Sequence, residues 1–445
     1  MNRYNLYKES GISWLGNIPS NWDVTRNKYF TIPIQDKSET GTEELLSVSE
    51  KKGVIPRRSI RNEEEHLSTS KTLVGYLKVL PGDLVSNIML MWKRGLGVSD
   101  LKGIVSPSYS VFRFINSEPK YYHYLFRTDQ YVSEFRRNST GVIESRLRLY
   151  DDSFGFMSSH RPPLSEQQQI VSFLDDKTQK IDSLIQQKEK KIELLKEKKT
   201  SLINLIVTKG LDSNVEMKDS GVEWIGKIPS HWGSSKLGFY TTKIGSGSTP
   251  RGGSEVYVDS GIPFIRSQNV HFNGLRLDGV SYIKYEVHHS MKGSTVVKED
   301  VLLNITGGSI GRCCIVNVDG EMNVNQHVSI IRTTSKLKNH FLNYILSCDL
   351  GQSQVRFNMS GGNREGLTIE GIRDFQITLP PISEQEQIVK YLDKQTEEID
   401  TLIQLEQKKI ETLQEYRQSL ISEVVTGKIR VCEEDNSLSL NSQIV

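Results

Sequence analysis

The fold of this chain is decided by the stretch PPLSEQQQIVSFLDDKTQKIDSLIQQKEKKIELLKEKKTSLINLIVTK, residues 162–209. Its two prolines bar a helix immediately upstream, and from Leu174 onward apolar residues recur at alternating steps of four and three. Such spacing over several heptads is typical of a coiled-coil seam. The stretch therefore predicts a helix of about 40 residues, roughly 60 Å long at 1.5 Å per residue.

The same stretch is written a second time at residues 380–427, where 27 of the 48 aligned positions are identical. Ser165 with Gln168, and Ser383 with Glu386, predict capping boxes at the two helix starts. Gly210 and Gly427 are expected as left-handed C-terminal caps. The predicted seam consists of Leu174, Ile181, Ile185, Ile192, Leu195, Leu202, Ile206, Leu392, Ile399, Ile403, Ile410, Leu413, Leu420 and Val424.

Three seam positions are polar in both copies, namely Thr178 with Thr396, Lys188 with Glu406, and Lys199 with Arg417. Polar residues in a seam lower stability but select register and partner. In an antiparallel pair we expect Lys199 to face Glu406, which is favourable. The same register sets Lys188 against Arg417, which repel each other unless both heads reach water. The alternative is that these positions lie near a solvated edge.

A shorter repeat precedes each of two dissimilar blocks. SGISWLGNIPSNW at residues 10–22 returns as SGVEWIGKIPSHW at residues 220–232, with 8 of 13 positions identical. The 445-residue chain is too long for one ordinary core. We predict an α+β protein with internal duplication, in which two mixed α/β domains are joined by two long helices forming an antiparallel coiled coil. The expected divisions are 1–22 (copied motif), 23–164 (first domain), 165–209 (helix), 210–232 (linker with second motif), 233–382 (second domain), 383–428 (helix) and 429–445 (polar tail).

Composition places the chain among core-forming globular proteins, with 25% charged and 36% hydrophobic residues. No apolar run reaches the 18 residues of a membrane span, and the polar N-terminus lacks the apolar run of a signal peptide. Cys313 and Cys314 are adjacent and no CxxC occurs, which favours ordinary reduced thiols. We therefore expect a cytoplasmic protein without membrane contact.

Each block mixes short β-rich runs with turn residues, and both share a framework of a turn, a strand and a loop. Residues 79–85 and 296–305 form the framework, and loops 91–97 and 306–312 follow it. Arg, Lys, Asn, Gln, Ser and Thr on such loops match the donors and acceptors of base edges in the major groove. Candidate DNA contacts are Arg57, Arg58, Arg61, Lys93, Arg94, Ser248, Thr249, Arg266, Ser267, Asn269, Thr306, Ser309, Arg312, Asn325, Gln326, His327, Asn363 and Arg364. Arg94 and Arg312, on corresponding loops, are expected at the DNA face.

The sequence offers no catalytic or metal-ligating constellation. The two Pro-Pro pairs are not preceded by Asn or Asp, as an adenine methyltransferase motif would require. The Gly-rich stretch at residues 245–249 lacks the Lys of a phosphate-binding loop, and no HExxH occurs. We predict neither catalytic nor metal-binding residues.

With these motifs the chain resembles the specificity subunits of Type I restriction–modification enzymes over nearly its whole length. The resemblance is carried by the Trp-Leu/Ile-Gly-x-Ile-Pro motifs, the two Pro-Pro-x-Ser-Glu-Gln helix starts, and NITGGSIGR (304–312) with NQHV (325–328). It implies that each block is a target-recognition domain reading one half of a bipartite site in double-stranded DNA. The helices would act as a ruler for the gap, with half-sites about one helical turn apart.

The resemblance also implies partners that perform the chemistry. The copied segments would dock two methyltransferase (M) subunits, and through them the ATP-driven restriction (R) subunits. No cofactor is expected in this chain, because S-adenosylmethionine would belong to the M subunits and ATP with Mg²⁺ to the R subunits. The chain itself would direct adenine methylation and restriction without being an enzyme.

Three alternatives are open at this point. One is a nuclease with an unrecognised motif, which would cleave DNA without partner subunits. Another is a coiled-coil protein-interaction scaffold, which would show no salt-dependent DNA affinity of the kind that phosphate contacts produce. The third is a specificity-like DNA-binding subunit of another defence system.

Overall fold

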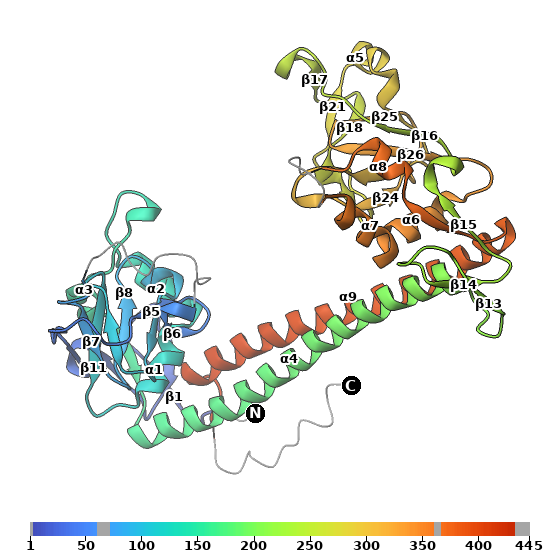
Figure 1. The fold of residues 1–445 in the computed structure, drawn as a ribbon. Coiled ribbons are helices and arrows are strands. Elements are labelled where there is room, and N and C mark those ends of the chain that lie inside the picture. The colour runs from blue at the N-terminus through green and yellow to red at the C-terminus, as the bar shows by residue number, and fades with distance from the viewer. Residues whose placement is uncertain (1–2, 60–71, 360–365, 432–445) are drawn as a thin grey trace. The chain divides into compact units, whose positions relative to one another are not determined.

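The computed structural model describes residues 3–59, 72–359 and 366–431. Their contacts divide the chain into two units, of which unit 1 comprises Met1–Lys188 and Lys408–Val445 and unit 2 comprises Glu189–Gln407. The two long helices, α4 (Leu164–Lys209) and α9 (Ile382–Val425), each contribute one part to unit 1 and one part to unit 2 (Figure 1). Each unit mixes helices and strands, which confirms the predicted α+β fold class.

Unit 1 is built on a four-stranded antiparallel sheet in the order β4-β11-β8-β9. Its strands are β4 (Thr31–Pro33), β8 (Leu84–Asn87), β9 (Leu96–Val98) and β11 (Tyr109–Phe114). The strand pairs are β1 (Tyr7–Glu9) with β2 (Asn17–Pro19), β3 (Asp23–Arg26) with β12 (Ser158–Arg161), β5 (Leu46–Ser49) with β6 (Gly53–Pro56), and β7 (Leu77–Val79) with β10 (Gly103–Val105). The helices are α1 (Pro119–Phe126), α2 (Asp129–Arg137) and α3 (Asp151–Phe156).

Unit 2 repeats this plan with a sheet in the order β16-β26-β23-β24 and adds a five-stranded sheet. The first sheet contains β16 (Thr241–Ser246), β23 (Val301–Asn304), β24 (Cys313–Ile315) and β26 (Val328–Thr333). The second contains β17 (Tyr257–Val258), β18 (Ile262–Ile265), β21 (Ser281–Ile283), β22 (Thr295–Val296) and β25 (Met322–Val324). The strand pairs are β13 (Met217–Asp219) with β14 (Lys227–Pro229), β15 (Gly233–Lys236) with β27 (Gln376–Leu379), and β19 (Val270–His271) with β20 (Gly274–Leu275). The helices are α5 (Tyr285–Ser290), α6 (Asn339–Ser347), α7 (Asp349–Met359) and α8 (Ile369–Arg373).

The same buried ion pair stabilises the main sheet of each unit. Asp83 is 1% exposed and accepts two hydrogen bonds of 2.9 Å from Arg113, while Asp300, also 1% exposed, accepts two of 2.7 Å from Arg332. Each carboxylate also accepts a backbone amide, from Leu80 or from Val297 (2.9 Å in each case). These contacts hold the turn that leads into β8 and β23, so the two blocks share this turn although their sequences differ.

The long helices pack against each other within each unit, with apolar residues inward. Of the predicted seam, Leu174, Ile181, Ile192, Ile206, Leu392, Ile399, Ile410, Leu413, Leu420 and Val424 are buried, and the other four are half-buried. In unit 1 the seam joins an aromatic core that includes Trp22, Phe126 and Tyr131. In unit 2 it joins a core that includes Trp232 and Phe341. The helices therefore belong to the cores of both units and are more than a connection.

The starts of the two helices differ from the sequence-based expectation, and the predicted capping boxes are wrong. The helices begin at Leu164 and Ile382, so Ser165 and Ser383 lie inside the first turn instead of capping it. Gln167 and Gln385 satisfy the preceding backbone instead. Each side chain donates to its Pro-Pro segment, to Pro162 O (2.8 Å) or to Pro380 O (3.0 Å), and accepts an amide from a neighbouring loop.

The register of the helices also differs from the one expected. Lys199 bonds Asp400 (2.6 Å) instead of Glu406, and Glu406 bonds Lys191 (2.9 Å). In unit 1, Arg417 pairs with Asp182 (2.9 Å) instead of facing Lys188. Heptad spacing alone leaves several registers equally apolar, and the flanking acidic residues select among them. The predicted caps Gly210 and Gly427 do adopt positive φ, 77° and 74°.

Candidate nucleic-acid interface

The loop after β23 in unit 2 is held by a fully buried amide. Asn304 Nδ2 donates to the carbonyl of Ser267 (2.8 Å) and to the hydroxyl of Ser309 (3.0 Å). The first bond ties this loop to the loop after β18, and the second closes the loop on itself. Loops 266–269 and 306–312 are therefore adjacent, although about forty residues separate them in the sequence.

A second loop joins the same edge of the sheet. Ile305 donates its backbone amide to the carbonyl of His327 (3.0 Å), and the Thr306 hydroxyl contacts His327 Nδ1. Gln326 contacts His327 Nε2 (3.1 Å) and accepts a hydrogen bond from Thr249. Hydroxyl, amide and imidazole groups from three loops thus form one cluster at the end of β16, β23 and β26.

Gly247 permits this approach of the loops. A Cβ at this position would lie 1.8 Å from the carbonyl oxygen of Val324, which is an impossible contact. Only glycine allows the segment after β16 to cross the end of β25. The exposed side chains of Ser248 and Thr249 then stand beside Gln326.

Two predicted contacts of unit 2 serve the backbone instead of facing outward. Asn269 is buried, accepts the Arg266 amide (2.9 Å) and donates to the Arg276 carbonyl (2.9 Å). Asn325 is buried as well and accepts the His327 amide (3.1 Å). Both shape the loops that carry other candidates. Asn363 and Arg364 lie outside the described residues.

Arg266 is oriented by aromatic rings. Its guanidinium carbon lies 5.2 Å from the ring centre of Tyr257 and 6.0 Å from that of Phe264. Within the described part of the chain its guanidinium has no ion-pair partner, and the same holds for Arg312 on the neighbouring loop. Stacking fixes the plane of the guanidinium and leaves its fork of N–H donors for a ligand with paired acceptors.

The unit 1 candidates are differently placed. Arg57 and Arg58 lie in a short 3-10 helix (Arg57–Ser59), where Arg58 pairs with Glu44 (3.0 Å), and Arg61 lies outside the described residues. Lys93 stands over the ring of Trp92, 4.7 Å from its centre. Arg58 and Lys93 are exposed and Arg57 is half-buried, and among the described residues no hydrogen bonds join them into a cluster comparable with that of unit 2.

Arg94 and Arg312 lie on corresponding loops but at different positions within them. The backbone amide of Asn87 donates to the Gly95 carbonyl (2.8 Å) and that of Asn304 donates to the Arg312 carbonyl (2.8 Å), so Gly95 corresponds to Arg312. Arg94 corresponds to Gly311, and both have positive φ. The Arg94 guanidinium pairs with Asp129 and donates to the Arg127 carbonyl (3.0 Å), so its donors are engaged inside unit 1.

Sequence reasoning missed one element at this edge of unit 1, the hairpin of residues 139–149 between α2 and α3. Leu149 donates to the Ile88 carbonyl (2.9 Å), just as Leu367 donates to the Ile305 carbonyl (2.8 Å) in unit 2. Leu149 and Leu367 therefore occupy corresponding places at the ends of β8 and β23. The sequence signal of the hairpin is the run of arginines at positions 136, 137, 146 and 148.

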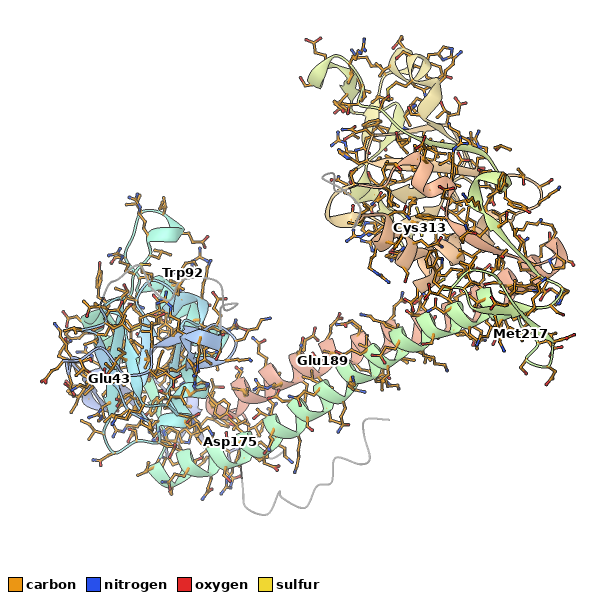
Figure 2. The ribbon with its side chains drawn as sticks, viewed as in Figure 1. Glu43, Trp92, Asp175, Glu189, Met217 and Cys313 are labelled. Atoms are coloured by element: carbon orange, nitrogen blue, oxygen red, sulfur yellow. The ribbon has the colours of Figure 1, made fainter. Side chains whose placement is uncertain are left out.

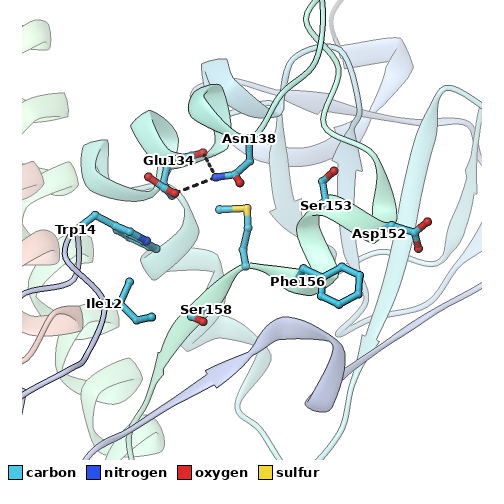
Figure 3. Close-up of a pocket in the computed structure, with 9 residues that line it drawn as sticks. Ile12, Trp14, Glu134, Asn138, Asp152, Ser153, Phe156 and Ser158 are labelled. Carbon is cyan, nitrogen blue, oxygen red and sulfur yellow. Dashed lines mark hydrogen bonds between the residues drawn. The ribbon is translucent and has the colours of Figure 1, made fainter.

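The copied motif of unit 1 borders a cavity of about 470 Å³ (Figure 3). Its lining residues are Ile12, Trp14, Glu134, Asn138, Asp152, Ser153, Phe156, Met157 and Ser158. Asn138 donates to both the main-chain and side-chain oxygens of Glu134 (2.9 Å each). The copied motif of unit 2 leaves Trp224 48% exposed, with its ring 5.7 Å from that of Phe357. Partly exposed aromatic side chains such as Trp14 and Trp224 are of the kind enriched at interfaces with protein partners.

Thiol and metal chemistry find no support among the described residues. Burial raises the pKa of Cys314 to about 12 and that of Cys348 to about 11, so both thiols stay protonated at neutral pH. Within the described ranges no group of three or more His, Cys, Asp or Glu could hold a metal ion. No helix among them is long and apolar enough to cross a membrane. Cys313, labelled in Figure 2, is buried inside unit 2 as well.

Comparisons with known proteins identify similar chains. A family model described as the Type I restriction modification DNA specificity domain matches residues 229–415. The Type I restriction enzyme MjaVIII specificity subunit of Methanocaldococcus jannaschii is 23% identical over 442 residues, covering 96% of this chain and 97% of the relative.

Two solved structures share the fold. The first is a chain from a structural study of complex assembly and conformational transition of the type I R-M system. Its TM-score is 0.72 at 17% identity, and the match covers 93% of this chain and 99% of that chain. The HsdS subunit from Thermoanaerobacter tengcongensis has a TM-score of 0.52 at 17% identity, covering 93% of this chain and 98% of its own. At this identity the likeness concerns the fold alone.

Proposed function

Because this chain belongs to the family of Type I restriction–modification specificity subunits, we propose that it reads a bipartite DNA site, one half with each unit. The proposal is carried by one observation, the occurrence of the same framework twice with different loops at the same sheet edge. Loop 89–95 is apolar and basic, whereas loop 306–312 is small and polar. Two different surfaces on one repeated framework suit two different half-sites.

The chemistry of the unit 2 cluster supports DNA as its ligand. Exposed Gln326 and the nearby hydroxyls can both donate and accept, as base edges in the major groove require. Arg266 and Arg312 supply forked donors that match the two acceptors of guanine. Among the residues predicted from the sequence, Ser248, Thr249, Thr306 and Ser309 lie with these groups, while Asn269 and Asn325 shape the loops that carry them.

We propose that the chain performs no chemistry itself and that partner subunits methylate adenine and restrict DNA. S-adenosylmethionine would then be bound by the M subunits, and ATP with Mg²⁺ by the R subunits. Among the described residues, burial raises the pKa of Tyr121 and Cys313 and lowers the pKa of His123 and His160, and these groups are packed inside the units instead of forming a cluster open to substrate.

The copied motifs are the proposed docking sites for two M subunits. Trp14 with its cavity and Trp224 with Phe357 lie at corresponding places of the two motifs. A surface that occurs twice in one chain suits two copies of the same partner. The partly exposed tryptophans supply the aromatic contact area that such interfaces favour.

The test of this function is long-read sequencing of methylated adenines in a host carrying this gene with its neighbouring methyltransferase gene. We expect a bipartite motif, with two short specified halves and an unspecified gap, that is absent when the methyltransferase gene is expressed alone. If the two proteins form a stable complex in the host and no new methylated motif appears, the proposal is contradicted. DNA cleavage by the isolated chain would instead support a nuclease.

The alternatives give different outcomes in a second assay. A protein-interaction scaffold shows no affinity for DNA that falls steeply with salt. A specificity-like subunit of another defence system directs the motif but confers no restriction of incoming DNA. Phage plating on the same host separates this last possibility.

A further inference from the structure

The hairpin of residues 139–149 stands out from unit 1 between α2 and α3 (Figure 1). Its two arms are joined by a pair of backbone hydrogen bonds between Thr140 and Arg148, both 2.9 Å. A short 3-10 helix (Glu144–Arg146) closes its tip, and Leu149 ties its base to Ile88 at the end of β8. The hairpin is therefore an ordered extension of the proposed reading edge.

The tip of this hairpin is apolar and exposed. Val142 is 99% exposed and Ile143 is 52% exposed, and Met89 and Leu90 are exposed on the loop beside the hairpin's base. Valine is among the residues most often fully buried in folded proteins. Because Val142 contacts no core, its apolar side chain contributes nothing to folding and is available to a ligand.

Positive charge surrounds this apolar tip. Residues 136–148 contain four arginines and one glutamate, a net charge of +3, whereas the whole chain carries +2. Arg136 pairs with Glu144 (2.8 Å), which fixes the hairpin to α2. Arg146 and Arg148 are exposed, and neither guanidinium has an ion-pair partner among the residues that the structure describes. An apolar tip flanked by arginines suits a ligand that carries an apolar group between negatively charged groups.

We propose that this hairpin enters the major groove of the first half-site, where Val142 contacts the methyl group of a thymine. The major groove admits a two-stranded ribbon, and the thymine methyl is the apolar group among the base edges there. Arg146 and Arg148 are then placed for the flanking phosphates. This inference rests on the proposed function and adds a chemical requirement, a thymine in the half-site that unit 1 reads.

The experiment uses the complete complex with its methyltransferase subunits and an unmethylated duplex that carries the motif identified by methylation sequencing. Each thymine is replaced in turn by deoxyuridine, which removes the methyl group and nothing else. We expect one replacement in one half-site to weaken binding about fourfold, the effect of exposing one buried methyl group. The variant Val142→Ser should bind the thymine duplex more weakly and no longer distinguish thymine from uracil at that position.

Val74→Ser is the matched control, since Val74 is also an exposed valine of unit 1 and lies in another loop. It should keep the wild-type preference for thymine. If wild type and Val142→Ser show the same preference at every position, the inference is overturned. It is also overturned if Val142→Ser loses the methyltransferase subunits while the preference persists, because the tip then docks protein. If the complex shows no sequence-specific binding, the proposed function fails with it.

Discussion

At the scale of single residues, the arginines of this chain differ in whether their guanidinium N–H groups already form hydrogen bonds within the protein. Arg94 is bound to Asp129 and to the Arg127 carbonyl, and Arg113 and Arg332 are bound to buried aspartates. Arg266 is stacked on two rings with its donors open. Residue type alone does not distinguish these roles, because a guanidinium serves ion pairs, ring stacking and base recognition equally.

Arg312→Ala should weaken binding to the cognate duplex by about 1–3 kcal/mol and relax one position of the second half-site, because a forked donor to a guanine is lost. Competition binding of the complex against a set of single-base variants measures both effects. Arg94→Ala is the control, expected to lower the stability of unit 1 and leave the motif unchanged. Unaltered affinity and motif for Arg312→Ala would remove this residue from the interface.

Two buried histidines predict acid sensitivity of unit 1. Burial lowers the pKa of His123 to about 3 and that of His160 to about 4, from an ordinary 6.5. Both fold as neutral rings, and the unfolded chain takes up protons as pH falls below 6.5. Their stabilisation is therefore present above pH 6.5 and is lost toward pH 4, by roughly 2 kcal/mol each between pH 7 and pH 5.

Urea unfolding followed by tryptophan fluorescence measures this loss in a Trp224→Phe, Trp232→Phe background, which leaves only the tryptophans of unit 1. His123→Gln cannot be protonated and should reduce the pH dependence by about half. A pH slope that His123→Gln leaves unchanged would show that other groups are responsible.

At the scale of elements, the paired helices tolerate polar residues because each one is satisfied. Thr178 and Thr396 bond the carbonyls of Leu174 and Leu392 one turn earlier, both at 2.7 Å. Glu406 is buried but accepts from Lys191. An intact buried ion pair adds little net stability, but leaving one partner buried and unpaired is strongly destabilising. Registers that separate Glu406 from Lys191 are therefore disfavoured.

Matched insertions test whether helix length sets the gap between half-sites. Seven residues inserted after Leu195 and seven after Ile403 keep the heptad seam and add about 10 Å to each helix. We expect the unspecified gap in the methylated motif to grow by about three base pairs, at 3.4 Å per pair. Four residues inserted after Leu195 alone, about 6 Å, break the facing seam and should change the gap or abolish assembly. An intact complex with an unaltered gap contradicts a ruler.

At the scale of the whole molecule, the two units share a common plan but have different chain connections. In unit 2 the end of α4 runs directly into the copied motif, and Gly210 lies against Trp232. In unit 1 the end of α9 takes that place, with Gly427 against Pro19 and Trp22 and Tyr121 donating to the Val425 carbonyl (2.9 Å). In unit 2 the helix end is covalently continuous with the copied motif against which it packs. In unit 1 the corresponding helix end is held against the copied motif by noncovalent contacts alone.

Much of this architecture could be predicted from local patterns. The repeated Pro-Pro starts, the heptads and the C-terminal glycines predicted both helices, and the shared Asp before β8 and β23 predicted a common framework. The capping boxes were wrong because the helices already begin at Leu164 and Ile382, where the carbonyls of Pro163 and Pro381 accept the first-turn amides. The pairing of Lys199 was wrong because seam spacing is periodic, whereas the ion pairs at its flanks are not.

The sequence by itself determined the duplication, the fold class and the general location of the loops, because these depend on repeats, period and turn residues that act over short range. Only the tertiary structure decided which side chains face outward. Asn325 and Gln326 are neighbours of similar chemistry, yet one shapes a turn and the other is exposed. The hairpin of residues 139–149 belongs to the reading edge only because Leu149 bonds Ile88, sixty residues earlier. Contacts between distant segments have no local signature, so the interface emerges only when the chain is folded.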